Sequence, residues 1–179
     1  MRDLWGRYRT DECLYHYTDG AATDLSRPMR VAVTADHNGV AVKNRLVERL
    51  RELGHEVDDR AEAALDEIVD YPPLCEDVCR RVLEGDADFA VVVGGSGSGE
   101  AICCNKLPGI RAALCLDPWV AEIARANNDA NVLVTGAKVV SADYAVLILE
   151  KWLATSFRGE RHAERLAMIA RLERGESLL

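Results

Sequence analysis

The stretch VVVGGSGSGEAICCNK, residues 91–106, places a run of valines directly before a loop that contains four glycines. Consecutive β-branched residues, here at the end of the segment DFAVVV, are typical of a buried strand. Glycines allow backbone conformations that other residues avoid, and they let a ligand or a neighbouring chain approach closely. Glu100 follows the last glycine and begins the next segment. The stretch therefore predicts a strand, a glycine loop and a helix that starts beside the loop.

The same order of strand, loop and helix recurs on both sides of this stretch. We predict strands within residues 29–39, 56–60, 88–94, 110–117 and 131–138. We predict helices over residues 40–55, 71–86, 118–128, 142–155 and 161–175, with a further helix from Glu100 onward. Strands that alternate with helices at this spacing predict an α/β fold with a parallel, doubly wound sheet of about five strands.

Length and charge limit the classes of protein to which the chain can belong. Its 179 residues suit one well-buried domain, which we assign to residues 29–179, and residues 1–28 are expected to form a flexible extension dispensable for activity. The net charge of −8 argues against binding to nucleic acid or to anionic membranes, since both need clustered Lys and Arg. No apolar stretch approaches the ~20 residues that span a bilayer.

The cysteine pattern suggests neither a metal site nor a disulfide framework. Six cysteines occur in the chain, without a CxxC pair and without a secretory signal at the beginning of the sequence. We interpret them as reduced thiols of a cytoplasmic protein. Cys103 and Cys104, the two nearest the glycine loop, are assigned to packing because no adjacent group lowers the pKa of their thiols.

Polar residues cluster where four of the predicted strands end. Asp36 and His37 follow the first strand, the glycine loop follows the third, Asp117 follows the fourth, and Gly136 to Lys138 follow the fifth. Ligands of open α/β sheets bind beyond the carboxyl ends of the strands. The sequence therefore predicts a binding site at this edge of the sheet.

The glycine loop does not match the common nucleotide-binding motifs. A dinucleotide fingerprint would follow the first strand, and a phosphate-binding Walker loop would contain GK[ST]. The loop does offer backbone N–H groups at the start of a helix, where a small anion or an oxyanion can be bound. Glu100 beside it is either a participant in the chemistry or a first-turn carboxylate that complements the helix dipole.

Several motifs in the correct order resemble the type B ribose-5-phosphate isomerase family, which also includes galactose-6-phosphate isomerase subunits. The motifs are VAVTADHNG, DYP at residues 70–72, GGSGSGE, NKLPGIRAAL, ANNDANVLVTG and RGERHAERL, and the resemblance runs from about Met29 to about Arg174. It implies a Rossmann-like three-layer fold and a cytoplasmic aldose-ketose isomerase that needs neither metal nor cofactor. It also implies a homodimer with a shared active site, with a tetramer as the alternative.

The implied reaction moves a proton between adjacent carbons of a phosphorylated sugar through an enediolate, with ribose 5-phosphate and ribulose 5-phosphate of the pentose phosphate pathway as the expected pair. In one branch of the family the base is a cysteine at the end of the third strand; in the other it is a glutamate after the loop. Here Gly94 occupies the cysteine position, so the resemblance implies that Glu100 is the base. Ser96 matches a hydroxyl residue that assists proton movement between the two oxygens.

The resemblance also implies the residues that bind the substrate. These are Asp36, His37, Tyr71, Gly95, Gly97, Ser98, Gly99 and Asn128. The phosphate is expected to be bound by Lys138, Arg161, His162 and Arg165. Asn128 and Lys138 are expected to reach the site from the partner subunit. The alternative for the arginines is an ordinary solvated basic face, and for His37 a loop histidine that caps the next helix.

One position departs from the family pattern. Asn127 stands where members acting on ribose 5-phosphate commonly carry a histidine credited with opening the furanose ring. Either His37 or Asp36 opens the ring instead, or the natural substrate never closes one, as for erythrose or erythrulose 4-phosphate, whose terminal oxygen is esterified. A sugar-phosphate-binding paralogue without activity is a third alternative, because a fold does not determine a function.

Overall fold

The computed structural model describes residues 28–60 and 68–179, so most of the predicted extension lies outside the described residues. Its five strands are β1 (Arg30–Ala35), β2 (Glu56–Asp59), β3 (Phe89–Gly94), β4 (Ala112–Leu114) and β5 (Val132–Gly136). They form one parallel sheet in the order β2-β1-β3-β5-β4. This confirms the predicted fold class. No helix in the described ranges is long and apolar enough to cross a membrane.

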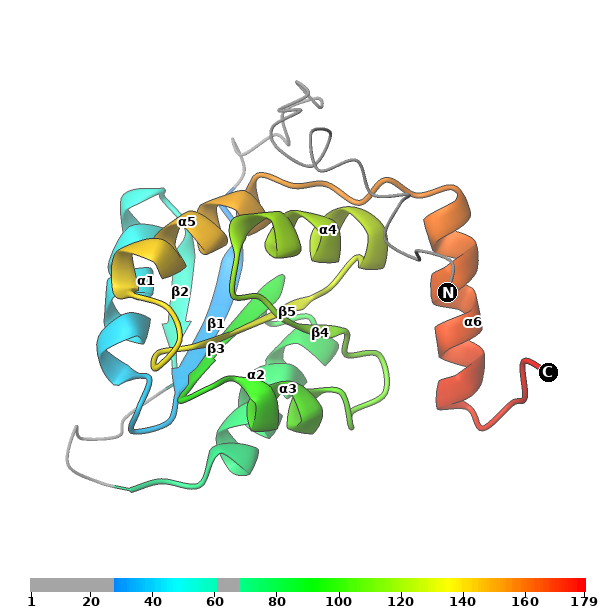
Figure 1. Ribbon diagram of the computed structural model, residues 1–179, viewed down its shortest axis with the longest axis horizontal. Helices are drawn as coiled ribbons and strands as arrows, with labels where there is room; N and C mark the ends of the chain where they lie inside the picture. Colours follow the sequence, from blue (N-terminus) through cyan, green and yellow to red (C-terminus); the bar gives the residue numbers. More distant parts are fainter. Residues whose placement is uncertain (1–27, 61–67) are drawn as a thin grey trace, which may run out of the picture.

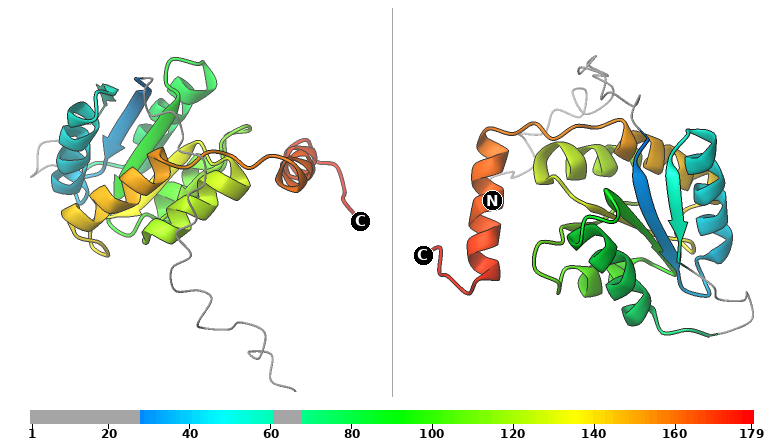
Figure 2. Two further views of the ribbon diagram at one scale, coloured as in Figure 1. Left: turned by 90° about the horizontal axis from the view of Figure 1, so that it is seen from above. Right: turned by 180° about the vertical axis from the view of Figure 1, so that it is seen from behind.

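Helices cover both faces of the sheet and complete a Rossmann-like three-layer fold (Figures 1 and 2). One face carries α1 (Val40–Glu52), α4 (Pro118–Asn128) and α5 (Ala142–Leu153). The other face carries α2 (Tyr71–Leu83) and α3 (Ser98–Cys104). Each of these helices corresponds to a predicted one, although α3 begins two residues before Glu100.

The strands supply side chains to two separate cores because successive residues of a strand point to opposite faces. Val31 and Val33 of β1 pack with α1 and α5, whereas Ala32 between them packs with α2 and α3. Burying a Val or Leu side chain fully contributes about 1.5–3 kcal/mol. Both faces of the central strands are therefore apolar, and polar residues remain only at the strand ends.

Asp117, predicted to belong to the polar edge, has a structural role. Its Oδ1 accepts a hydrogen bond from the backbone N–H of Trp119 at 2.7 Å, which caps α4, and Pro118 occupies the first turn. Its Oδ2 accepts a hydrogen bond from the Tyr144 hydroxyl at 2.8 Å. The carboxylate thereby fixes the start of α4 against α5, at the carboxyl end of β4.

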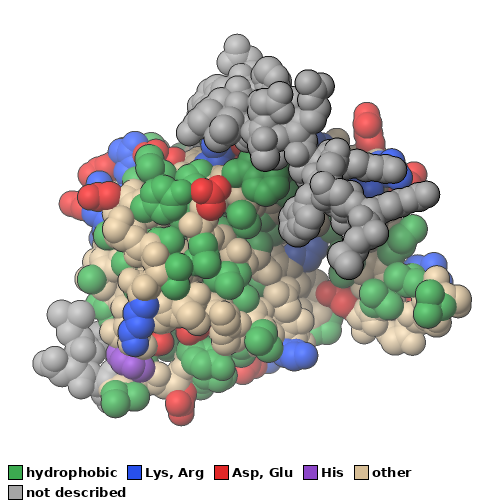
Figure 3. Space-filling model, in the orientation of Figure 1, with side chains coloured by type: hydrophobic (Ala, Val, Ile, Leu, Met, Phe, Trp, Pro, Cys, Tyr) green, Lys and Arg blue, Asp and Glu red, His purple; other side chains and the backbone are tan. Residues whose placement is uncertain are grey.

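The last helix, α6 (Arg161–Glu173), stands apart from the other elements (Figures 1 and 2). None of its residues is buried, and its apolar residues Met168, Ile169 and Leu172 are between 41 and 55 % exposed. Hydrophobic side chains are visible on the surface of this part of the molecule (Figure 3). A cavity of about 530 Å³ separates the helix from the β4 edge of the sheet. Among the described residues, the apolar side chains of α6 therefore remain partly exposed.

Candidate active site

The glycine loop connects β3 to α3 and lies against the end of β5. Gly97 has a φ of 82°, in the left-handed region that favours glycine. A Cβ at Gly136 would lie 2.5 Å from the carbonyl oxygen of Ser96. The N–H of Ala137 donates to the carbonyl oxygen of Gly94 at 2.8 Å. Gly97 therefore permits the left-handed turn before α3, and Gly136 permits the close contact between the glycine loop and the end of β5.

Glu100 lies in the first turn of α3 and is only 4 % exposed. Its carboxylate lies directly against the α-carbon of Gly94, in the space where any side chain at position 94 would begin. This position matters because the family resemblance implies that residue 94 is where the alternative base, a cysteine, would stand. The Glu100 carboxylate thus occupies the same region at the end of β3 that a side chain of residue 94 would occupy.

The start of α3 brings the loop together with Tyr71, the first residue of α2. The Tyr71 hydroxyl is so close to Gly99 that a Cβ there would lie 2.7 Å from it. The backbone N–H of Ser98 donates to the hydroxyl of Ser96 at 3.3 Å. The predicted hydroxyl, amide and tyrosine are therefore neighbours, as a shared substrate site requires.

The turn between β1 and α1 lies on the other side of the loop. Asp36 accepts hydrogen bonds from the backbone N–H groups of Asn38 at 2.9 Å and Gly39 at 3.1 Å. The Asn38 side-chain nitrogen lies 3.0 Å from the Asp36 carboxylate and 3.0 Å from His37 Nε2. It also lies 3.5 Å from the position of a Cβ on Gly95. Asn38, which is not among the predicted site residues, therefore joins Asp36 and His37 to the glycine loop.

The backbone of Lys138 lies beside the glycine loop of its own chain. Its N–H donates to the carbonyl oxygen of Gly95 at 2.9 Å. The family resemblance implies that Lys138 reaches the site from the partner subunit, and within one chain it already adjoins the loop. The side chain is exposed. Because β5 is a central strand next to β3, its carboxyl end meets the glycine loop within one subunit.

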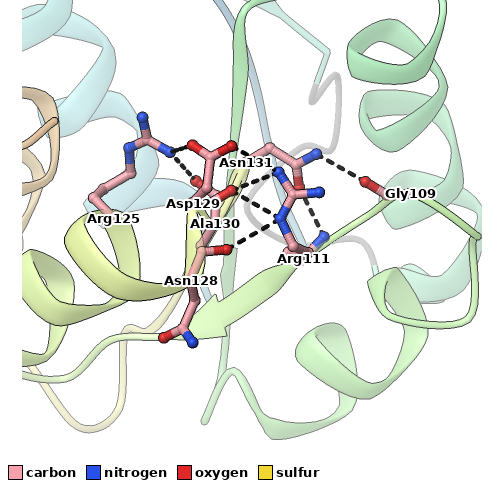
Figure 4. A network of polar contacts seen from close by, with 7 residues as sticks. All are labelled: Gly109, Arg111, Arg125, Asn128, Asp129, Ala130 and Asn131. Carbon is pink, nitrogen blue, oxygen red and sulfur yellow. Dashed lines mark hydrogen bonds and ion pairs between the residues drawn. The ribbon is translucent and has the colours of Figure 1, made fainter. Parts of the chain in front are cut away.

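Asn128 lies at the opposite edge of the sheet, at the end of α4. Arg111 donates hydrogen bonds to the backbone carbonyls of Asn128 at 3.1 Å and Asp129 at 2.7 and 2.9 Å (Figure 4). Arg125 donates to the Asp129 carboxylate at 2.8 Å, while the Asn128 side chain points away from this network (Figure 4). The length of β5, roughly 16 Å at ~3.3 Å per residue, separates Asn128 from the glycine loop of the same chain.

Arg161, His162 and Arg165 occupy the first turns of α6, and their side chains make no hydrogen bond or ion pair with the described part of the chain. The segment before α6 is attached to the end of α4, because the N–H of Arg158 donates to the carbonyl oxygen of Ala126 at 2.9 Å. The predicted phosphate ligands therefore belong to the same end of the molecule as Asn128.

One chain thus carries the predicted site residues in two groups. The first, at the carboxyl edge of the sheet, is Asp36, His37, Tyr71, residues 95–100 and Lys138. The second, beyond the amino edge, is Asn128, Arg161, His162 and Arg165. The structure does not bring these two groups together within a single chain.

The cysteines behind the site are packed, as predicted. Cys75, Cys79 and Cys104 are fully buried between α2 and α3. Hydrogen bonds with Cys75 and Cys79 raise the pKa of the Cys104 thiol, and burial raises the pKa of Cys103. The thiols of Cys103 and Cys104 are therefore neutral near pH 7. Among the described residues, no group of three or more His, Cys, Asp or Glu side chains is arranged to hold a metal ion.

Comparison with known proteins gives one consistent result. Residues 31–169 match the model of the ribose/galactose isomerase family. The chain is 36% identical over 144 residues to ribose-5-phosphate isomerase B of Escherichia coli, covering 80% of this chain and 96% of that protein. It is 35% identical over 147 residues to ribose-5-phosphate isomerase B of Mycobacterium tuberculosis, covering 82% and 91% of the two chains.

Solved structures show the same similarity. Ribose-5-phosphate isomerase B of Clostridium thermocellum superposes with a TM-score of 0.80 at 38% identity, covering 83% of this chain and all of that one. The Thermotoga maritima protein of the same name gives a TM-score of 0.78 at 36% identity, covering 81% and 99%. Identity above one third over nearly the whole length of these relatives indicates common ancestry as well as a common fold.

Proposed function

Because the chain belongs to the ribose/galactose isomerase family, we propose that it interconverts a phosphorylated aldose and its ketose, with ribose 5-phosphate and ribulose 5-phosphate as the first pair. The observation that carries this proposal is the buried carboxylate of Glu100 against Gly94. A base there would adjoin the amide groups of the loop and the Tyr71 hydroxyl. This arrangement suits removal of a proton next to a carbonyl.

In the proposed reaction, the Glu100 carboxylate takes the proton from C2 of the open-chain aldose, and the C1 carbonyl oxygen becomes the oxyanion of an enediolate. Loop amides at the start of α3 stabilise the negative charge, because donors already in place need no reorganisation. The carboxyl group then returns the proton to C1 to give the ketose. Ser96 assists by moving a proton between the oxygens on C1 and C2.

We further propose that two subunits build each site. The glycine loop, Glu100 and Lys138 come from one subunit, and Asn128 with the α6 arginines comes from the other. The proposal is supported by the separation of the two groups in one chain and by the exposed apolar residues of α6. Arg161 and Arg165 are four residues apart on the helix and share one face, so both guanidinium groups can bind one phosphate.

A mixing experiment tests the shared site. Arg165→Met is expected to lower kcat/KM by about tenfold or more, because a charge-assisted hydrogen bond to phosphate is lost, and Glu100→Gln removes the base. In dimers of one variant each, one site carries both defects and the other carries neither. Co-refolded mixtures of the two variants should therefore recover about a quarter of wild-type activity, since half of the dimers are mixed and half of their sites are intact.

Arg171→Met is the matched control, since Arg171 lies on α6 beyond the predicted phosphate ligands and bonds to Glu176 at 2.9 Å. It should leave kcat/KM close to that of the wild type. A mixture no more active than the average of the two parent variants would contradict the shared site. Glu100 and Arg165 of each site would then come from the same subunit.

Asn127 supports a second candidate, a tetrose 4-phosphate such as erythrose 4-phosphate. The Asn127 side-chain oxygen accepts a hydrogen bond from Arg158 at 3.4 Å, and an amide cannot exchange protons near neutral pH as an imidazole does. Tetrose 4-phosphates cannot close a furanose ring, so they need no residue in this role.

A substrate panel with Asn127→His distinguishes the two candidates. If ribose 5-phosphate is the substrate, the wild type should turn it over. If the wild type turns over only tetrose 4-phosphates, the second candidate is correct and the first is wrong. Asn127→His should raise turnover of ribose 5-phosphate by about tenfold or more, as expected for a restored acid-base group. Turnover of erythrose 4-phosphate should not change. Equal effects on both sugars would contradict a role for position 127 in ring opening.

A further inference from the structure

The Asn38 side chain lies between the two polar residues that precede it. Its amide nitrogen is 3.0 Å from Asp36 Oδ2 and 3.0 Å from His37 Nε2. Asp36 Oδ1 meanwhile accepts the backbone N–H groups of Asn38 and Gly39. Asp36 therefore accepts three hydrogen bonds, which hold its side chain in place.

These contacts determine which nitrogen of His37 carries the proton. A carboxylate can only accept, so the atom of Asn38 that faces Asp36 must be the NH₂ nitrogen and not the amide oxygen. An NH₂ group can only donate, so its second hydrogen requires an acceptor at His37 Nε2. Nε2 must then be unprotonated, and the neutral ring carries its proton on Nδ1.

His37 Nδ1 is buried and has no hydrogen-bond partner in the part of the chain that the structure describes. A buried N–H without an acceptor is unfavourable, and a bound oxygen relieves it. The turn that carries His37 adjoins the glycine loop, since the N–H of Asp36 donates to the carbonyl oxygen of Val93 at 3.2 Å and Asn38 lies next to Gly95. An oxygen of a bound sugar phosphate is the acceptor that this position suits.

We propose that Asn38 is a positioning residue that holds His37 as a neutral imidazole with its proton on Nδ1, from which His37 donates a hydrogen bond to a substrate oxygen. The assignment of that oxygen to a sugar phosphate rests on the proposed function. Because Nε2 is engaged by the amide, His37 binds and polarises the oxygen without relaying a proton. His37 is then not free to replace the missing ring-opening histidine, and Asp36 is already held by three hydrogen bonds, so the site is suited to open-chain substrates.

The tautomer can be measured directly by ¹⁵N-¹H long-range correlation spectra of the histidine rings in the full chain near pH 8. The chain contains four histidines, and the His37→Gln variant assigns the signal of interest. The wild type should show a protonated Nδ1 and an unprotonated Nε2. In Asn38→Asp, whose carboxylate can only accept, the proton should move to Nε2. In Asn38→Ala the ring should relax towards the mixture seen for an unconstrained histidine.

Asn44→Asp is the matched control, because it introduces the same change at an exposed position of α1 and should leave both the spectrum and the kinetics unchanged. Asn38→Ala should lower kcat/KM for the preferred sugar phosphate on the order of tenfold, through loss of the ordered donor. A wild-type His37 protonated on Nε2 would overturn the proposal, whatever the activity. The spectra need no substrate, so they test the tautomer independently of the isomerase activity. If the proposed function were wrong, turnover would be absent while the spectra still showed the proton on Nδ1.

Discussion

Replacing Glu100 with glutamine is expected to lower kcat by about 10³-fold while the affinity for the sugar phosphate changes little, since a positioned general base contributes about 10²–10⁴-fold. Glutamine keeps the size and shape of the side chain but cannot accept the proton from carbon. The side chain is 4 % exposed and lies against Gly94, which leaves little room for a water molecule to replace the carboxylate. Steady-state kinetics gives kcat, and titration calorimetry gives the affinity.

Glu48→Gln is the matched control, because Glu48 is an exposed residue of α1 whose side chain pairs with Arg45 on the surface. It should leave kcat unchanged. If Glu100→Gln retained more than a tenth of wild-type kcat, another residue would have to be the base. If the wild type itself bound sugar phosphates without turning them over, the chain would be a binding paralogue and not an isomerase.

Local sequence patterns were sufficient to predict the elements of the fold. In β1, Val31 and Val33 point into one core and Ala32 points into the other. In the sequence, these residues form an apolar run before a polar turn, which predicts a buried strand. The side chains of Asp117 and Ser141 cap the starts of α4 and α5, although Asp117 was predicted as part of the polar edge. Such signals depend on residues close together in the sequence, so they can be recognised without knowledge of the tertiary structure.

The arrangement of the site depended on contacts between distant segments and could be predicted only in part. The predicted polar residues of the first group lie at one edge of the sheet because the carboxyl ends of parallel strands meet there. The place of Lys138 beside Gly95 of its own chain follows from the pairing of β5 with β3, which the sequence does not reveal. Asn38 was missed because an asparagine in a turn is common, and only its contacts with Asp36 and His37 distinguish it.

The requirement for glycine at position 94 is likewise a tertiary effect, and it leads to the second large prediction. A Cβ on residue 94 would overlap the carboxylate of Glu100. Gly94→Ala should therefore displace the carboxylate and lower kcat on the order of 10²-fold, within the range that a misplaced general base loses. Since Gly94 is not at a positive φ, the backbone itself should tolerate alanine. Kinetics and thermal unfolding of the variant would be measured together.

A double-mutant cycle tests whether the alanine acts through Glu100. If its only effect on catalysis is to displace the base, Gly94→Ala should cause little further loss in a protein that already carries Glu100→Gln, because the two changes remove the same interaction. Losses that multiply in the double variant would mean that alanine disturbs the oxyanion site or the fold independently. A Gly94→Ala variant with wild-type kcat would show that the carboxylate can act from another position, and the observation on which the isomerase proposal rests would lose its force.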